Sequence, residues 1–149
     1  EEEETFETVV DCDIDAFIPD GYIKNEYLKL DVYKRISAIE TDDEYMDMQD
    51  ELIDRFGEPP EEAVALLDIA LLRSQASEKG IAEIKQQDGR LLLTFAETDF
   101  VRLSALCGDA AFKGRLLLNA GSSPYLSLRL EKTEKAMDMA RLLVDKYSA

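Results

Sequence analysis

The sequence predicts an α+β fold: a strand and three helices, followed by two β-hairpin–helix units, in the order βαααββαββα. Apolar and polar residues alternate near the N-terminus, which is typical of a half-buried strand. Helix-capping residues and Gly-Pro breaks then divide residues 25–80 into three helical segments. Asp88-Gly89 lies between two apolar runs, a strong signal for a hairpin. Successive hairpins favour a mostly antiparallel sheet over a doubly wound one.

The first strand is expected over residues 6–16, where one face is apolar and the other acidic. Pro19 ends this pattern. Asn25 is a suitable N-cap for a helix over residues 26–38. The apolar stripe of that helix is Leu28, Val32, Ile36 and Ile39.

A capping box, Thr41-Asp42-Asp43-Glu44, opens a second helix that runs to Phe56 and ends at Gly57. Its predicted inward residues are Tyr45, Met48, Leu52 and Phe56, with Met46 and Ile53 beside them. A different face carries Asp43, Asp47, Asp50 and Asp54, with Glu51 near its border. Pro59-Pro60 restarts the chain in a third helix, apolar nearly all round and therefore expected to be buried, which Gly80 closes.

The second half is predicted to contain strands at 81–85, 90–95, 115–119 and 125–130 and a short helix at 99–106. Thr133 is expected to cap a final helix. The inward residues of that helix are predicted to be Ala136, Met137, Ala140, Leu143, Val144 and Tyr147.

Charge is distributed unevenly along the 149 residues, whose net charge is −16. Residues 1–79 have a net charge of −17 and residues 80–149 a net charge of +1. An acidic half repels phosphate, so we expect no direct nucleic-acid binding and favour a basic protein surface as partner. Simple solubility explains the charge equally well. The high charge also favours a monomer.

The composition fits one domain, 1–149, with residues 1–5 expected to be disordered. No apolar run is long enough to span a bilayer, and the N-terminus Glu1-Glu2-Glu3-Glu4 is not a signal peptide. A chain that begins on these residues is expected to be an excised fragment. Two isolated cysteines, Cys12 and Cys107, argue against a disulfide framework and fit a reducing cytoplasm.

Common catalytic motifs are missing from the sequence. It has no histidine, no glycine followed by Lys-Ser or Lys-Thr as in a P-loop, and no Gly-x-Ser-x-Gly elbow. We therefore expect no catalytic residues, no metal and no cofactor, and no enzyme activity of this chain alone. A carboxylate-based metal enzyme is a weak alternative.

Glu51 and Asp54 lie three residues apart on one helical face. A solvated acidic face is one interpretation. However, acids near a helix C-terminus oppose the macrodipole, and aspartates four residues apart repel one another. An acidic face that is retained although it destabilises the helix is suited to bind arginine side chains of a partner, which pair with carboxylates through two hydrogen bonds. The residues leave both interpretations open, and Arg55 weakens the second by neutralising part of the face.

Several segments, in order, resemble one family: the C-terminal domain of the bacterial transcription-repair coupling factors (Mfd). The most specific are Ile18-Pro19-Asp20, Tyr33-Lys34-Arg35-Ile36, Glu51-Leu52-Ile53-Asp54-Arg55-Phe56-Gly57 and Leu66-Leu67-Asp68-Ile69-Ala70. The resemblance runs from about Thr8 to Phe95, and beyond Phe95 it is one of pattern only.

The resemblance implies a regulatory, autoinhibitory domain of an ATP-dependent DNA translocase that displaces stalled RNA polymerase and recruits nucleotide excision repair. In that family the C-terminal domain docks on a UvrB-like N-terminal module and masks UvrA binding. The two acids of the family motif belong to that contact, which implies Glu51 and Asp54 as interdomain interface residues here. A free-standing acidic adaptor with a basic protein partner is the alternative.

Overall fold

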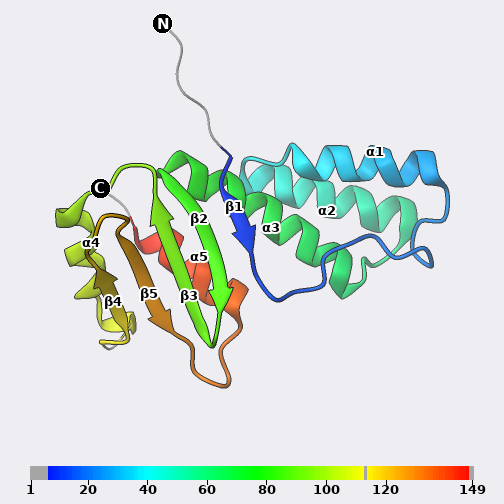
Figure 1. Cartoon of the computed structure of the whole chain (residues 1–149). Helices are drawn as coiled ribbons and strands as arrows, with labels where there is room; N and C mark the ends of the chain where they lie inside the picture. The colour runs from blue at the N-terminus through cyan, green and yellow to red at the C-terminus, as the bar shows by residue number, and fades with distance from the viewer. Residues whose placement is uncertain (1–6, 113, 148–149) are drawn as a thin grey trace, which may run out of the picture. The chain divides into compact units, whose positions relative to one another are not determined.

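The computed structural model describes residues 7–112 and 114–147, so the disorder expected for residues 1–5 lies outside the described residues. The chain divides into two compact units. Residues 14–75 form the helical unit, and the described residues of 7–13 and 76–147 form the sheet unit (Figure 1). The α+β prediction is confirmed in both class and element order. The expectation of a single domain remains a prediction.

The helical unit contains α1 (Glu26–Ser37), α2 (Asp42–Phe56) and most of α3 (Glu61–Glu78). The predicted caps form. The Asn25 side chain accepts from the Tyr27 and Leu28 amides at 2.9 and 3.1 Å, and Thr41 accepts from the Glu44 amide at 3.1 Å. In a capping box the Glu44 carboxylate would accept from the amide of the N-cap residue, Thr41. Here it accepts from the amide of the preceding residue, Glu40, at 3.0 Å.

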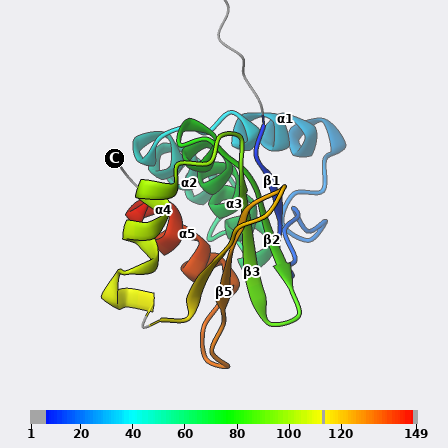
Figure 2. The ribbon, with the colours of Figure 1, turned by 60° about the vertical axis from the view of Figure 1, so that its left-hand side comes forward.

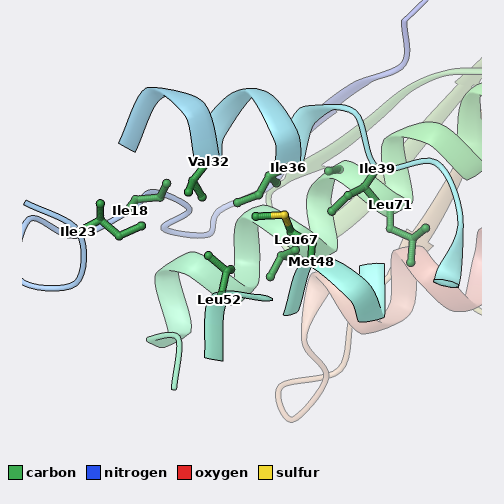
Figure 3. Close-up of a cluster of buried hydrophobic side chains, with 10 residues drawn as sticks. Ile18, Ile23, Val32, Ile36, Ile39, Met48, Leu52, Leu67 and Leu71 are labelled. Atoms are coloured by element: carbon green, nitrogen blue, oxygen red, sulfur yellow. The ribbon is translucent and has the colours of Figure 1, made fainter. Parts of the chain in front are cut away.

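An apolar cluster holds the helical unit together (Figure 3). Its ten buried members are Ile18, Ile23, Val32, Ile36, Ile39, Met48, Leu52, Leu67, Ala70 and Leu71. The labelled members come from α1, α2, α3, the segment before α1 and the connection between α1 and α2. Most of the predicted stripes of α1 and α2 are therefore confirmed, although Leu28, in the first turn of α1, is 37% exposed. On α3, residues 62–77 are all buried or half-buried, as its sequence predicted.

Met46 and Ile53 were predicted to lie beside the buried face of α2, and this prediction is wrong. Met46 is 60% exposed and Ile53 is 40% exposed. Met48 and Leu52 occupy the centre of the buried face, at 5% and 1% exposed. Seven residues separate Met46 from Ile53, so they align two turns apart on one flank of the helix, outside the cluster.

The sheet unit contains a five-stranded sheet in the order β1-β2-β3-β5-β4. Its strands are β1 (Val9–Asp11), β2 (Ile81–Gln87), β3 (Arg90–Phe95), β4 (Leu116–Asn119) and β5 (Tyr125–Arg129). β1 pairs with β2 in parallel, and every other pairing is antiparallel. The mostly antiparallel sheet is confirmed.

The Asp88-Gly89 hairpin is confirmed in detail. Both residues have positive φ, 51° and 74°, which a two-residue type I′ turn requires. One face of the sheet is apolar: Leu91 and Leu93 of β3 lie opposite Leu128 and Leu126 of β5, and all four are 0% exposed. Figures 1 and 2 show α5 (Ala136–Lys146) along one face of the strands, and Figure 2 shows α4 (Phe100–Cys107) on that same side. A short 3-10 turn, η1 (Ala110–Phe112), was not predicted.

Two predictions in the sheet unit are wrong. The first strand covers only Val9–Asp11 instead of residues 6–16. The backbone pairing with β2 ends there, because the Asp13 amide donates to the Gln86 side chain at 2.7 Å and not to a backbone carbonyl of β2. Phe6 lies outside the described residues. The last helix begins at Ala136, with Lys135 at the cap position and no side-chain cap, so Thr133 does not cap it.

The late start of α5 has a physical cause in Glu134. The Arg115 guanidinium donates to both oxygens of the Glu134 carboxylate, at 2.7 and 3.0 Å. The same carboxylate accepts from the Glu131 amide at 2.7 Å, which closes a turn over residues 131–134. The pKa of Glu134 is lowered, first by the hydrogen bond from Arg115. This turn occupies the place where the sequence predicted the first helical residues.

Candidate functional site: the acidic face of α2

The candidate site lies on α2, where the sequence placed the acidic pair. Asp43, Asp47, Asp50 and Asp54 are all exposed and recur every three or four residues, so they form one strip along the helix. We call these four residues the acidic strip. Asp54 lies in the last turn of α2, close to the negative end of the helix dipole, where a carboxylate is destabilising by a few tenths of a kcal/mol.

Glu51 is engaged within the domain. The Arg35 guanidinium, from α1, donates to both oxygens of the Glu51 carboxylate, and Arg55 donates to it at 3.1 Å. These partners lower the pKa of Glu51 to about 2, with the hydrogen bond from Arg35 as the largest cause. The same bond raises the pKa of Arg35. Glu51 therefore links α1 to α2, and its charge is compensated internally.

Asp54 differs from Glu51. It is exposed, and in residues 7–112 and 114–147 its carboxylate accepts no hydrogen bond and forms no ion pair. The two acids of the predicted interface thus lie one turn apart on α2 with different environments. Of the two, Asp54 is the one whose oxygens are free for an external donor.

The rest of the segment Glu51 to Gly57 mostly supports the fold. Leu52 is 1% exposed in the core cluster. The Arg55 guanidinium lies 5.0 Å from the centre of the Phe56 ring, and that ring packs edge-on against Tyr22 with centroids 5.9 Å apart. Gly57 ends the helix at a φ of 86°, a conformation that favours glycine. Ile53 and Asp54 of this segment are exposed and take no part in the contacts given above.

Tyr22 and Tyr33 support the helical unit and lie at the rim of its core. Both are partly buried against the core cluster. The Tyr22 hydroxyl donates to the Gly57 carbonyl at 2.7 Å, and the Tyr33 hydroxyl accepts from the Ile18 amide at 2.8 Å. The Asp20 carboxylate accepts from the Lys29 ammonium. These contacts fix the segment before α1 to the helices.

A shallow hollow of about 180 Å³ borders the acidic strip on the side of Glu51. Arg35, Ala38, Ile39, Glu44, Asp47, Met48 and Glu51 line it. It is large enough for the end of one side chain, and its carboxylates suit a cation. Within the described ranges no group of three or more Asp, Glu or Cys residues is arranged to hold a metal ion. No described helix is long and apolar enough to cross a membrane.

The sequence predicted that Arg55 neutralises part of the acidic face, but the contribution of Arg35 was missed. Arg55 lies four residues after Glu51 on the same helix, a spacing that can be read directly from the sequence. Arg35 lies sixteen residues before Glu51, and only the packing of α1 on α2 brings the two together. The available signal for Arg35 was the basic last turn of α1, which contains Lys34 and Arg35. Cations are favourable at a helix C-terminus and can pair with a carboxylate of a neighbouring helix.

The TRCF domain family model matches residues 12–106. A transcription-repair-coupling factor from Staphylococcus aureus (strain USA300) is 33% identical over 146 residues, 96% of this chain and 12% of that protein. The factor from Bacillus subtilis (strain 168) is 39% identical over 94 residues, 63% of this chain and 8% of that protein. The chain thus spans about an eighth or less of the length of these relatives.

A solved structure has the same fold. The crystal structure of the C-terminal domain of a transcription-repair coupling factor superposes with a TM-score of 0.77, at 23% identity, covering 95% of this chain and 92% of that one. The chain belongs to the TRCF domain family, which includes the C-terminal domain of the transcription-repair coupling factor (Mfd). The similarity extends past Phe95, where sequence reasoning saw only a pattern.

Proposed function

We propose that this chain is the regulatory domain of a transcription-repair coupling factor, docking through α2 on a UvrB-like module of the same protein. Membership of the TRCF domain family supports the assignment to such a parent. The main observation in favour of this docking surface is the exposed acidic strip. It ends in Asp54, a carboxylate without an internal partner among the described residues. An arginine of the module would bind it through charge-assisted hydrogen bonds.

The proposed mechanism is masking. In the closed state this domain covers the surface of the module that UvrA would bind, and it restrains the translocase motor until RNA polymerase is engaged. Each charge-assisted hydrogen bond contributes about 1.5–3 kcal/mol, so a few such bonds hold the closed state reversibly. A competing partner that binds only the open state shifts the population with a few kcal/mol of differential affinity. ATP hydrolysis belongs to the parent motor and not to this domain.

Calorimetric titration of this chain against the separate UvrB-like module tests the proposal. We expect binding that weakens between low and moderate salt, because exposed charges are screened. Asp54→Arg is expected to weaken binding at least tenfold. Asp138→Arg, the same charge change at an exposed position of α5 in the sheet unit, serves as the matched control and should bind normally.

Two outcomes would contradict the proposal. Equal affinity of the module for wild type and for Asp54→Arg would show that the acidic strip is not part of the docking contact. No binding, together with unchanged UvrA affinity and ATPase rate when Glu51→Ala and Asp54→Ala are introduced into the parent protein, would refute the regulatory role. The alternative, a free-standing acidic adaptor, predicts this second result and binding to a different basic protein.

A further inference from the structure

An exposed apolar edge runs beside the acidic strip. Met46 and Ile53 lie two turns apart on α2 and are 60% and 40% exposed. At 100° per residue, both fall on the flank of the strip opposite the one that carries Glu51 and the hollow. Asp50 lies next to both on the helix surface, because it is four residues after Met46 and three before Ile53, and i+3 and i+4 neighbours share a face. We call Met46 and Ile53 the apolar edge.

The local structure does not account for the exposure of these two side chains. The buried face of α2 is filled by Met48 and Leu52, and Tyr45 and Phe56 pack against the core cluster from its margins. Neither Met46 nor Ile53 belongs to that cluster. Single exposed apolar residues are ordinary, but two aligned on one line beside four carboxylates form a composite surface.

We propose that the docking surface of this domain is composite: the acidic strip binds basic side chains of the partner, and the apolar edge enters an apolar depression beside them. The inference rests on the proposed function and specifies the chemistry of its partner. Charge complementarity selects the occupant, because four aspartates exclude an acidic or a purely apolar surface. The partner surface is therefore a row of Arg or Lys bordered by an apolar hollow on one side only.

The two components have different physical signatures. Contacts between exposed charges weaken with salt, whereas burial of apolar surface does not, and it gives a negative heat-capacity change on binding. Interface energy is concentrated in a few well-buried side chains surrounded by weaker polar contacts, and Met is enriched in such centres. The apolar edge is thus expected to supply the binding that remains at high salt, and the strip to supply specificity and the association rate.

The test uses this chain and the UvrB-like module, with titrations at several salt concentrations and temperatures. We expect Met46→Ser with Ile53→Ser to weaken binding about tenfold or more at every salt concentration, to reduce the heat-capacity change, and to leave the salt dependence unaltered. Asp50→Asn with Asp54→Asn should instead flatten the salt dependence. Because Met46 and Ile53 are exposed, both variants should retain the wild-type melting temperature within a few degrees.

Tyr27→Ser with Leu30→Ser is the matched control. These residues are 85% and 64% exposed on α1, in the same unit, and lie outside the strip and the edge. Unchanged affinity in this control, with loss in the Met46 and Ile53 variant, supports the inference. Wild-type affinity in the Met46 and Ile53 variant, while Asp54→Arg still weakens binding, would overturn the apolar edge and leave the proposed function standing. Absence of wild-type binding at every salt concentration, together with unchanged UvrA affinity and ATPase rate in the parent protein that carries Glu51→Ala and Asp54→Ala, would overturn both.

Discussion

Replacing Glu51 by Gln is expected to destabilise the helical unit, whereas replacing Asp54 by Asn is not. Glu51→Gln keeps the shape of the side chain but removes the negative charge to which Arg35 and Arg55 donate hydrogen bonds. The shift of the Glu51 pKa from 4.5 to about 2 corresponds, at about 1.4 kcal/mol per unit, to about 3.5 kcal/mol before solvent screening. Because the Arg35 and Arg55 side chains are 41% and 39% exposed, screening reduces the expected loss to about 1 kcal/mol.

Asp54→Asn provides the matched comparison. It removes one carboxylate one turn further along α2, in a residue with no ion pair in the described chain. It also relieves repulsion from Asp50 and an unfavourable position near the helix C-terminus. We expect a stability equal to that of the wild type or higher by a few tenths of a kcal/mol. Urea unfolding at pH 7, with amide hydrogen exchange resolving α1 and α2, measures both variants.

The pH dependence gives a second readout of the same contact. The folded pKa of Glu51 is depressed, so its stabilisation is fully present above about pH 4.5 and is lost as the pH falls through about 2. The stability difference between wild type and Glu51→Gln should therefore shrink progressively from pH 5 to pH 2. The reasoning is refuted if Glu51→Gln costs nothing at pH 7, if Asp54→Asn costs as much, or if the difference does not depend on pH.

Two further predictions concern single side chains. Tyr22→Phe removes the hydrogen bond to the Gly57 carbonyl and should lower the free energy of unfolding by about 1 kcal/mol, measured in urea; an unchanged midpoint would contradict a role for this bond. Burial, then the charges of Asp11 and Asp13, raise the pKa of Cys12 to about 11. In a Cys107→Ala background, the maleimide labelling rate of Cys12 should therefore still be rising at pH 10, and a plateau below pH 9 would show that the thiol is unperturbed.

Most elements of the fold were predictable because their signals are local. The Asn25 and Thr41 caps, the Gly57 stop and the Asp88-Gly89 turn each act through hydrogen bonds or backbone angles within a few residues. Thr133 failed for the opposite reason. Its neighbour Glu134 is held by Arg115, nineteen residues away, and no local pattern shows that contact. Local capping propensity is weaker than a bidentate ion pair that also closes a turn.

The candidate site was predictable in location but not in its internal organisation. Periodicity alone placed Asp43, Asp47, Asp50 and Asp54 on one exposed face. Periodicity does not define the edges of an apolar face, and so Met46 and Ile53 were assigned to the wrong side of that boundary. Periodicity also says little about Glu51, on the opposite border of the acidic strip. The role of Glu51 depends on how α1 packs against α2, because that packing brings Arg35 to its carboxylate.

The distinct environments of Glu51 and Asp54 determine which substitutions can test docking. Glu51→Ala removes one carboxylate but also releases Arg35 and Arg55, which then present two uncompensated cations beside the strip. Weaker docking in that variant would follow from repulsion of a basic partner even if Glu51 never touched it. Asp54 has no ion pair to release in the described chain, so its substitution leaves no arginine uncompensated beside the strip. A difference between the two single variants, measured at equal stability, therefore separates a residue that touches the partner from one that positions the surface.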